Sequence, residues 1–533
     1  MYWIFLCIFS EMTVSRPIGN CKARGSSSAP LKIEIDSGGV CFSSVMTAIY
    51  SVSLAAVTWR HEMWRDELQA WLIARDSLSI SDLFHNLHYE GHPALWYLLL
   101  YLPAHLSWNP VSMQVINFVL AVINAWLILS AKELPWYFRT LLVFGFFSFF
   151  MYGVTARSYM LSLVLLSVAS RCMLSRSKHP ILALAFLALA INTHVFAIPL
   201  VAILYLSLFC FGTGYSWKDP VTTFRKAKFW ATSLILILGV VVAYLTVRPP
   251  PDLRSAYTDG SNVSFLNSFL SSTGGSWVAF VPIPRSYMPK RWVTLFAPGH
   301  PTLLAPLISI TLLLLLTASF RSARSRFIFL GSAILDLVAF AITVRSPQPW
   351  HYGYMFVAFM LALLCDSYSE TSKEVKAWLP SRFSVVLIVA ILAFQSIAGL
   401  GVSAKDLSGP FSEAKETSEW LQRSGYSGNP LIIDPDTVGP ALLGYMERQS
   451  AYYPACGCFG SFVKFKADWN SSREISAQDL NSIYKSSKLP AVFVTDKPLD
   501  QRRLEYLRLR PLHSFDRHTI FSDENYFLYL QIL

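Results

Sequence analysis

Apolar residues in this chain gather in runs of about 14 to 20 positions, separated by short basic or aromatic stretches. A soluble core would show strand-like alternation or the 3.6-residue period of amphipathic helices. Long uncharged runs are instead typical of helices that cross a bilayer. The pattern therefore predicts an α-helical polytopic membrane protein with about eleven spans. The predicted spans are 41–58, 111–130, 140–156, 158–175, 180–194, 196–212, 229–247, 301–319, 327–344, 351–368 and 383–403.

Two apolar segments depart from the usual span length. Residues 94–107 are short and contain Pro103, so we expect a helix that lies in the outer leaflet rather than a full span. Segment 179–212 has 34 residues, enough for one tilted helix or for a tight hairpin. Because it is about twice the usual span length, the hairpin is favoured, with its turn near Asn192–His194.

After Gly401 the apolar runs become short and strand-like, and helix-like polar stretches such as 411–424 lie between them. Strands that alternate with helices predict a small α/β domain. No glycine-rich nucleotide-binding loop is present in this part of the sequence. The predicted strands are 430–435, 490–496 and 526–533.

Three regions follow from this pattern. Residues 1–40 are polar and rich in Ser and Gly after a short apolar start, so we expect a disordered cytoplasmic extension. Residues 41–403 form the transmembrane domain, with outer loops at 59–110 and 248–300. Residues 404–533 form the extracytoplasmic α/β domain.

The distribution of charge supports an orientation with the amino-terminus in the cytoplasm and residues 404–533 on the opposite side of the membrane. The chain is 53% hydrophobic and 14% charged, with a net charge of +11. The predicted cytoplasmic connections hold 15 Lys and Arg in 59 residues, against 10 in 100 residues on the opposite side. Positive residues favour the cytoplasmic side, so the excess charge reflects orientation rather than nucleic-acid binding.

Cysteine usage gives no sign of a zinc site, because the eight cysteines form no CxxC pair or Cys/His cluster. Cys456 and Cys458 are one residue apart, a spacing at which we do not expect a good disulfide. The aromatic stretch 452–460 around them is expected to stack on sugar or to pack on the membrane domain.

The first outer loop concentrates charged and aromatic residues at 59–71. One interpretation is an interfacial helix with an aromatic belt and solvated charges. The functional interpretation places Asp66 and Glu67 at a cavity, where one carboxylate takes a proton from an acceptor hydroxyl, and Trp64 at the substrate. Ionisable residues held at a membrane boundary favour the functional interpretation.

A second polar group, Glu90 and His92, precedes Pro93. A carboxylate and an imidazole this close are candidate ligands for a divalent metal ion that neutralises a phosphate leaving group. The structural alternative is a helix N-terminus capped by polar groups.

The order of these segments resembles the GT-C glycosyltransferases over residues 59–160. It is most similar to the branch of protein O-mannosyltransferases, aminoarabinose transferases and lipopolysaccharide-core galacturonosyltransferases. The resemblance implies that Asp66 is the catalytic base, with Glu67 beside it, and that Glu90 and His92 contribute to metal or lipid-phosphate binding. One departure is Met113-Gln114-Val115, where relatives often carry an arginine.

Arg157 is the cation expected to replace that arginine, since it is the only charged residue between Arg139 and Arg171. The planar guanidinium of Arg157 can donate two hydrogen bonds to a lipid phosphate. The alternative is that the side chain extends to the lipid headgroups at the membrane surface. An Ala-Arg-x-Tyr sequence similar to that around Tyr159 occurs in family members at this place. Further candidates on the predicted outer side are Arg345 and His351 for phosphate, His194 for substrate, and Arg254 and Asp259 for an acceptor groove.

These residues predict a membrane glycosyltransferase that moves a sugar from a polyprenyl-phosphate donor to a lipid, glycan or protein acceptor, in a bacterial inner membrane. A transporter or lipid flippase is the main rival, and it would need charges buried along the spans. The chief mid-span candidates are Asp336 and Arg157. A non-catalytic scaffold whose tail binds a partner is the second rival.

Overall fold

The computed structural model describes residues 40–174, 179–211, 227–253, 264–282, 304–344, 347–369, 381–447, 450–470, 473–517, 519 and 524–532. Within these residues, helices occupy each of the eleven apolar segments that the sequence predicts. Ten of them are α2 (Val40–Arg60), α6 (Val111–Leu129), α8 (Ser158–Leu174), α9 (Pro180–Ile191), α10 (Ala197–Phe211), α12 (Ala227–Val247), α14 (Leu304–Ser319), α15 (Ala323–Thr343), α16 (Pro349–Ser369) and α17 (Ser381–Ser408).

Five helices in the described part of the chain are long and apolar enough to cross a membrane by length and composition. Six others are apolar but shorter. Together with the composition, these helices indicate a helical membrane protein. The five long ones are Phe42–Arg60, Val111–Leu129, Trp136–Val154, Ala323–Thr343 and Arg382–Ser408.

The segment predicted as a span at 140–156 is not one regular helix. It begins earlier, as α7 (Trp136–Val143), and continues after a break as the π-helix η1 (Phe146–Val154). Gly145 is extended at the break, and Gly399 of α17 lies against it, where an added Cβ would be 3.1 Å from the Phe144 carbonyl oxygen. The break thus allows α17 to approach closely, and π-turns of this kind often mark functional sites.

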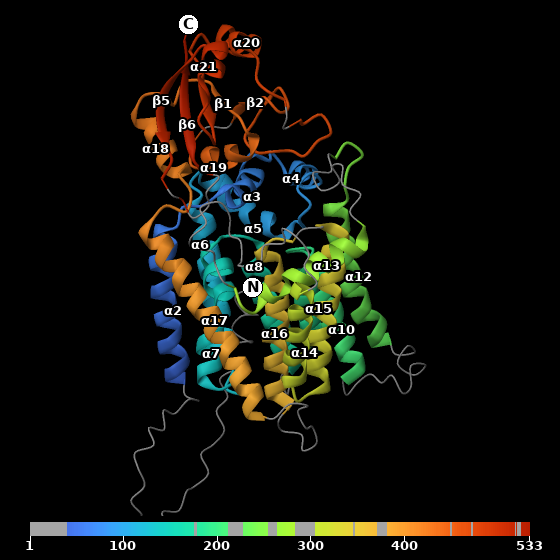
Figure 1. Cartoon of the computed structure of the whole chain (residues 1–533). Coiled ribbons are helices and arrows are strands. Elements are labelled where there is room, and N and C mark those ends of the chain that lie inside the picture. The colour runs from blue at the N-terminus through green and yellow to red at the C-terminus, as the bar shows by residue number, and fades with distance from the viewer. Residues whose placement is uncertain are drawn as a thin grey trace, which may run out of the picture. The chain divides into compact units, whose positions relative to one another are not determined.

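Three short helices, α3 (Arg65–Asp76), α4 (Ile80–Leu87) and α5 (Leu95–Leu106), follow α2. Figure 1 shows them between the long helices and the strands. The helix expected at 94–107 is α5, and it contains Pro103. The hairpin expected at 179–212 is also present, since α9 ends at Ile191 and α10 begins at Ala197.

Described residues of three predicted cytoplasmic connections, 131–139, 171–179 and 366–382, contact one another at one end of the long helices. Ser43 donates a hydrogen bond to the Leu129 carbonyl, and Arg171 donates to the Leu127 carbonyl. Tyr368, at the end of α16, interacts with Glu133 and Arg171. The opposite ends of the helices carry the first outer loop and the turn at Arg157.

All strands that the structure describes in a sheet belong to the carboxyl-terminal segment. The sheet order is β3-β2-β1-β4-β6-β5, with β1 parallel to β2 and β4 and the remaining pairs antiparallel. The predicted strands coincide with β1, β4 and β6, and the helix predicted at 411–424 coincides with α18. The bounds are β1 (Leu431–Ile433), β2 (Ala451–Tyr453), β3 (Cys458–Gly460), β4 (Val492–Thr495), β5 (Leu509–Phe515), β6 (Tyr526–Gln531), α18 (Ala414–Arg423), α19 (Gly439–Gly444), α20 (Ala477–Ser487) and α21 (Gln501–Leu507).

This α/β segment packs directly on the first outer loop. Gly444 of α19 faces Leu68 of α3 so closely that an added Cβ would lie 2.8 Å from the leucine Cβ. The Tyr445 hydroxyl accepts a hydrogen bond from the Met63 amide at 2.6 Å, and the Glu524 carboxylate accepts one from the Arg65 amide at 3.0 Å. The start of α3 is therefore fixed by the membrane helices on one side and by the α/β segment on the other.

Candidate active site

The centre of the candidate site is a contact between Asp66 and Arg157. Asp66 lies in the first turn of α3, and Arg157 lies in the turn between η1 and α8. Arg157 Nη1 is 2.9 Å from Asp66 Oδ2. The Asp66 side chain is 32% exposed and the Arg157 side chain 13% exposed, so solvent and a ligand can reach the pair.

The turn that carries Arg157 is held by buried hydrogen bonds. Asn117 of α6 donates its amide N–H groups to the Tyr152, Gly153 and Thr155 carbonyl oxygens. The Ala156 amide donates to Glu67 Oε1 at 2.6 Å. Because buried backbone groups are costly to leave unpaired, these contacts fix where the Arg157 side chain begins.

Glu67 has surroundings that differ from those of its neighbour Asp66. Its side chain is fully buried, and its second oxygen, Oε2, lies 3.1 Å from His61 Nε2. The other ring nitrogen of His61 lies 2.9 Å from Asp406 Oδ2 at the end of α17. Burial lowers the pKa of His61, but Asp406 and Glu67 outweigh it and raise this pKa to about 10. His61 is therefore an imidazolium between two carboxylates at neutral pH.

Trp64 is also buried rather than open to a ligand. It precedes α3, its ring is 1% exposed, and it packs edge-on against Trp350 at 5.8 Å between ring centroids. Gln114 of α6 donates a hydrogen bond to the His61 carbonyl at 3.2 Å. Both residues thus shape the loop that carries Asp66.

Aromatic and imidazole rings surround Arg157 on its other side. The guanidinium lies 5.3 Å from the Tyr159 ring centroid, which favours the cation through the negative ring face. The Tyr159 ring is 4.8 Å from that of His194, and the His194 ring is 5.1 Å from that of His92 and 6.4 Å from that of His351. The fold therefore brings five of the predicted phosphate, metal and substrate residues together.

Hydrogen bonds assign the protons on these imidazoles. The Phe196 amide donates to Nδ1 of His194, and the Gln348 amide donates to Nδ1 of His351, so Nε2 carries the proton in both neutral rings. Burial, followed by the charges of His92, His351 and Arg157, lowers the pKa of His194 well below its usual range. His194 Nε2 is buried without a hydrogen-bond partner among the described residues, so it is an unused donor close to Arg157.

Glu90 and His92 lie beside the same arginine. Glu90 accepts hydrogen bonds from Gln69 at 3.1 Å and from the Tyr97 hydroxyl at 3.3 Å. Burial raises the pKa of Glu90 to about 7, with a further contribution from Asp66. Burial and the charge of Arg157 lower the pKa of His92 to about 4, so His92 is neutral at pH 7.

A metal at these two residues has limited support from the donor set. His92 Nδ1 is 3.8 Å from Glu90 Oε1, and both Glu90 oxygens already accept hydrogen bonds. No group of three or more His, Cys, Asp or Glu suited to a metal occurs within the described residues. Metal binding by Glu90 and His92 stays a prediction.

The remaining candidates have different outcomes. Arg345, Arg254 and Asp259 lie outside the described residues. The expectation that Cys456 and Cys458 would not bridge is wrong, because they form a disulfide with their Cα atoms 5.2 Å apart. Gly457 between them adopts φ of +62°, a left-handed conformation that glycine allows and that closes the turn.

Two residues of this site, Asp406 and Gln69, could not be recognised in the sequence. Asp406 lies 345 positions from His61 at the end of an apolar helix, where a lone acid reads as a solvated terminus. Gln69 bridges Glu90 to the backbone of Val463 in the carboxyl-terminal segment. The only sequence signal for them was that a histidine and two acidic residues lie near the ends of predicted spans on the same predicted side of the membrane.

Comparison with known proteins gives a likeness of fold only. No family model matches the sequence, and no curated protein matches it. The crystal structure of ArnT from Cupriavidus metallidurans bound to undecaprenyl phosphate shares 13% identity, covers 92% of this chain and 98% of that chain, and has a TM-score of 0.48. The apo structure of the same protein shares 14% identity, covers 92% and 97%, and has a TM-score of 0.45.

At TM-scores below 0.5 this likeness supports no conclusion about the family or the residue roles of this chain.

Proposed function

We propose that this chain is a membrane glycosyltransferase that moves a sugar from a polyprenyl-phosphate donor to an acceptor hydroxyl. The observation that supports the proposal most is the 2.9 Å contact between Asp66 and Arg157 at one end of the apolar helices. A carboxylate that can take a proton and an arginine that can hold a phosphate are thus adjacent at this end of the helices.

Arg157 is the proposed phosphate ligand. Its guanidinium is held by a fixed turn and offers a planar fork of N–H donors, which matches the oxygens of a phosphate. The protonated Nε2 of His194 and that of His351 would add neutral donors, and the Tyr159 ring supports the guanidinium. A phosphate bound there competes with Asp66 for Arg157 and so releases the carboxylate.

Asp66 is the proposed base. When the phosphate engages Arg157, the Asp66 carboxylate takes the proton of the acceptor hydroxyl, and the acceptor oxygen attacks the anomeric carbon of the sugar. The bond between that carbon and the phosphate oxygen breaks, and polyprenyl phosphate leaves with the bonding electrons. One displacement inverts the anomeric configuration. Glu67 serves as a positioning residue, because both of its oxygens are engaged.

The orientation is also part of the proposal. We place the carboxyl-terminal segment and the Asp66 loop outside the cytoplasm of a bacterial inner membrane, with the amino-terminus inside. The Cys456–Cys458 disulfide supports this placement, because disulfides persist in oxidising compartments such as the periplasm. The acceptor is a lipid, a glycan or a protein.

Transfer by the purified protein tests the proposal. The protein in lipid nanodiscs is incubated with a panel of radiolabelled polyprenyl-phosphate sugars and a membrane extract that contains acceptors. We expect sugar incorporation by the wild type, loss of at least a hundredfold in Asp66→Asn, and unchanged activity in Glu419→Gln, a control acid on α18. Incorporation by Asp66→Asn at the wild-type rate would contradict the proposal.

A further inference from the structure

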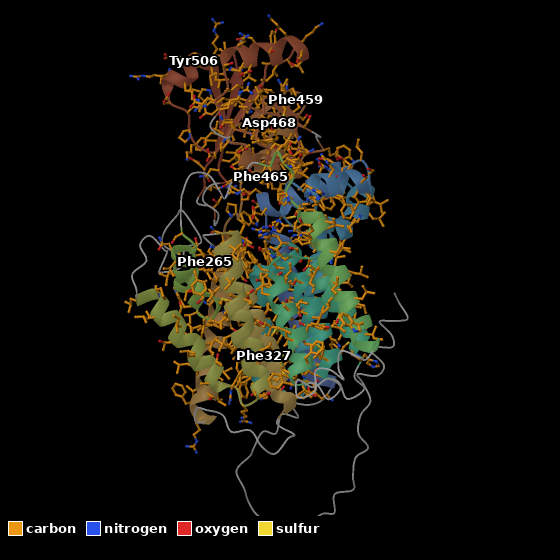
Figure 2. All side chains as sticks on the ribbon, turned by 90° about the vertical axis from the view of Figure 1, so that its right-hand side faces the viewer. Phe265, Phe327, Phe459, Phe465, Asp468 and Tyr506 are labelled. Carbon is orange, nitrogen blue, oxygen red and sulfur yellow. A yellow bond between two sulfur atoms is a disulfide. The ribbon has the colours of Figure 1, made fainter. Side chains whose placement is uncertain are left out.

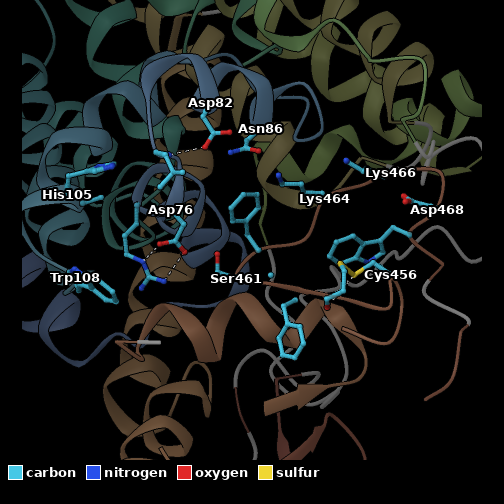
Figure 3. A pocket seen from close by; sticks show the side chains of 18 residues that line it. Asp76, Asp82, Asn86, His105, Trp108, Cys456, Ser461, Lys464, Lys466 and Asp468 are labelled. Carbon is cyan, nitrogen blue, oxygen red and sulfur yellow. Dashed lines mark hydrogen bonds and ion pairs between the residues drawn. A yellow bond between two sulfur atoms is a disulfide. The ribbon is translucent and has the colours of Figure 1, made fainter. Parts of the chain in front are cut away.

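A groove of about 710 Å³ lies between the first outer loop and the carboxyl-terminal segment. Figure 3 shows side chains from α3 and α4 on one side, and from the β2–β3 turn and the chain after β3 on the other. This volume falls within the range of sites that hold small molecules or parts of larger ones. The groove is lined by other residues than Asp66 and Arg157, and it includes part of the aromatic stretch 452–460.

Two aromatic rings stand at the groove with large exposed surfaces. Phe459 on β3 is 57% exposed, and Trp108 after α5 is 42% exposed. The Cys456–Cys458 disulfide closes the turn that precedes Phe459, so the ring is presented by a covalently fixed hairpin. The guanidinium of Arg75 lies over one face of the Trp108 ring, 5.3 Å from its centroid, and so helps to hold that ring in place. Exposed aromatic surface beside a cavity favours a binding role.

The polar lining of the groove carries both signs of charge in equal number. Its basic residues are Arg75, Lys464 and Lys466, and its acidic residues are Asp76, Asp82 and Asp468. Arg75 and Asp76 pair through two contacts of 2.7 and 2.9 Å, which leaves them with polar edges but little net charge. A balanced lining of this kind does not select a strongly anionic ligand, but it offers donors and acceptors to a ligand rich in hydroxyl groups.

Asn86 supplies an unsatisfied acceptor at the same place. Its amide nitrogen donates to Ser77 Oγ at 2.9 Å, and Ser77 Oγ donates its own proton to the Ile73 carbonyl at 2.6 Å. The amide orientation is thereby fixed, because the serine oxygen can only accept from Asn86. Asn86 is 3% exposed, and its Oδ1 has no hydrogen-bond partner among the described residues. A buried acceptor of this kind in a groove lining can be satisfied by a ligand donor or by an ordered water.

The groove is connected to the candidate active site through α3. Gln69 donates to the Val463 carbonyl at 2.8 Å and to Glu90, so one side chain ties the groove wall to the residues around Arg157. Asp66 and Asp76 stand at the two ends of α3, and ten residues of helix span about 15 Å. A ligand that fills the groove and reaches Asp66 must therefore be extended.

We infer that the groove binds an extended, uncharged saccharide as the acceptor of the transfer reaction. Sugar rings present weakly positive C–H groups to the faces of Phe459 and Trp108, and their hydroxyls suit the mixed lining and Asn86. This inference rests on the proposed function, because it assigns the saccharide as acceptor. Among the lipid, glycan and protein acceptors that the proposed function allows, the inference selects a glycan, in the form of an oligosaccharide.

Direct binding without a donor tests the inference. Saturation-transfer NMR is measured on the full chain in nanodiscs with neutral tetrasaccharides of glucose, galactose, mannose and N-acetylglucosamine as probes. We expect at least one to bind the wild type and the affinity to fall roughly tenfold in Phe459→Ala and in Trp108→Ala. Figure 2 shows Tyr506 away from Phe459 in the same carboxyl-terminal segment, and Tyr506→Ala, a control ring that is 65% exposed, keeps the wild-type affinity.

The result separates this inference from the proposed function. Asp66→Asn retains saccharide binding but loses transfer. Transfer by the wild type without binding of any tetrasaccharide, or wild-type affinity in both aromatic variants, overturns the groove assignment alone. Saccharide binding that depends on Phe459 in a protein that transfers no sugar overturns the proposed function and leaves a saccharide-binding groove. Binding of peptides in place of saccharides also overturns the inference.

Discussion

Asp66 and Arg157 are 91 positions apart in the sequence, and their side chains meet at 2.9 Å. The carboxylate lies in the first turn of α3, whose amino-terminus favours negative charge. The guanidinium belongs to a turn whose backbone is bound by Glu67 and Asn117. The pair is thus held from both sides, yet the Asp66 side chain keeps a third of its surface exposed. A phosphate that takes over Arg157 would leave Asp66 in place and without its partner.

Substitutions of the neighbouring acids Asp66 and Glu67 are expected to lower the free energy of unfolding by different amounts. Glu67→Ala removes a buried carboxylate that pairs with His61 and accepts from the Ala156 amide, so we expect a loss of about 3–5 kcal/mol. Asp66→Asn breaks a partly exposed ion pair and is expected to cost less than about 1 kcal/mol. Thermal unfolding of the purified variants measures this difference. Equal destabilisation by both substitutions would contradict the division between base and positioning residue.

His61 is expected to make stability depend on pH. Its folded-state pKa of about 10 lies above the ordinary value of 6.5, so the stabilisation is fully present below pH 6.5 and is lost as pH rises through about 10. The difference in Tm between the wild type and His61→Asn should therefore shrink between pH 6.5 and pH 10. His85→Asn, a change at an exposed histidine on α4, serves as the control. A constant difference for His61→Asn would show that His61 is not charged in the folded protein.

Glu90 is expected to make phosphate binding depend on pH. Its pKa of about 7 means that Glu90 gains a negative charge near Arg157 as pH rises through 7, and this charge opposes a phosphate. Relative to Glu90→Gln, the wild type should bind polyprenyl phosphate equally at pH 5.5 and several-fold more weakly at pH 8.5. Titration of the phosphate itself affects both proteins and cancels in the ratio. The experiment uses the full chain in nanodiscs, and a ratio that stays constant with pH would contradict this role.

The elements that the sequence predicts well are those with a strong local signal. Long apolar runs and the span-length argument predict the helices and the hairpin at Asn192–His194, because a bilayer demands about 20 apolar residues per crossing. Strands β1, β4 and β6 are short, continuous apolar runs between turn residues, which is also a local signal. The break before η1 was not predicted, because its packing partner is Gly399 of α17, more than 200 positions away in the sequence.

The residues of the candidate site also divide into those with a local sequence signal and those without one. Asp66, Glu67, Arg157 and Glu90 stand out because charge is rare in this chain and each lies beside an apolar run. The different roles of Asp66 and Glu67 could not be predicted, because adjacent residues on a helix differ by 100° in direction and only the packing shows which side is buried. The groove could not be predicted either, because it forms where Lys464 and Phe459 meet a loop nearly 400 positions earlier.

Binding of polyprenyl phosphate to Arg157→Ala and Asp66→Asn, measured side by side, tests the central claim most directly. The account predicts that Arg157→Ala binds the lipid at least tenfold more weakly than the wild type, because the charge-assisted contact to phosphate is lost. It predicts that Asp66→Asn binds the lipid at least as tightly as the wild type while its rate of sugar transfer falls at least a hundredfold. Wild-type affinity in Arg157→Ala, or weakened binding in Asp66→Asn equal to that in Arg157→Ala, would contradict the assignment of phosphate to the arginine and of the proton to the aspartate.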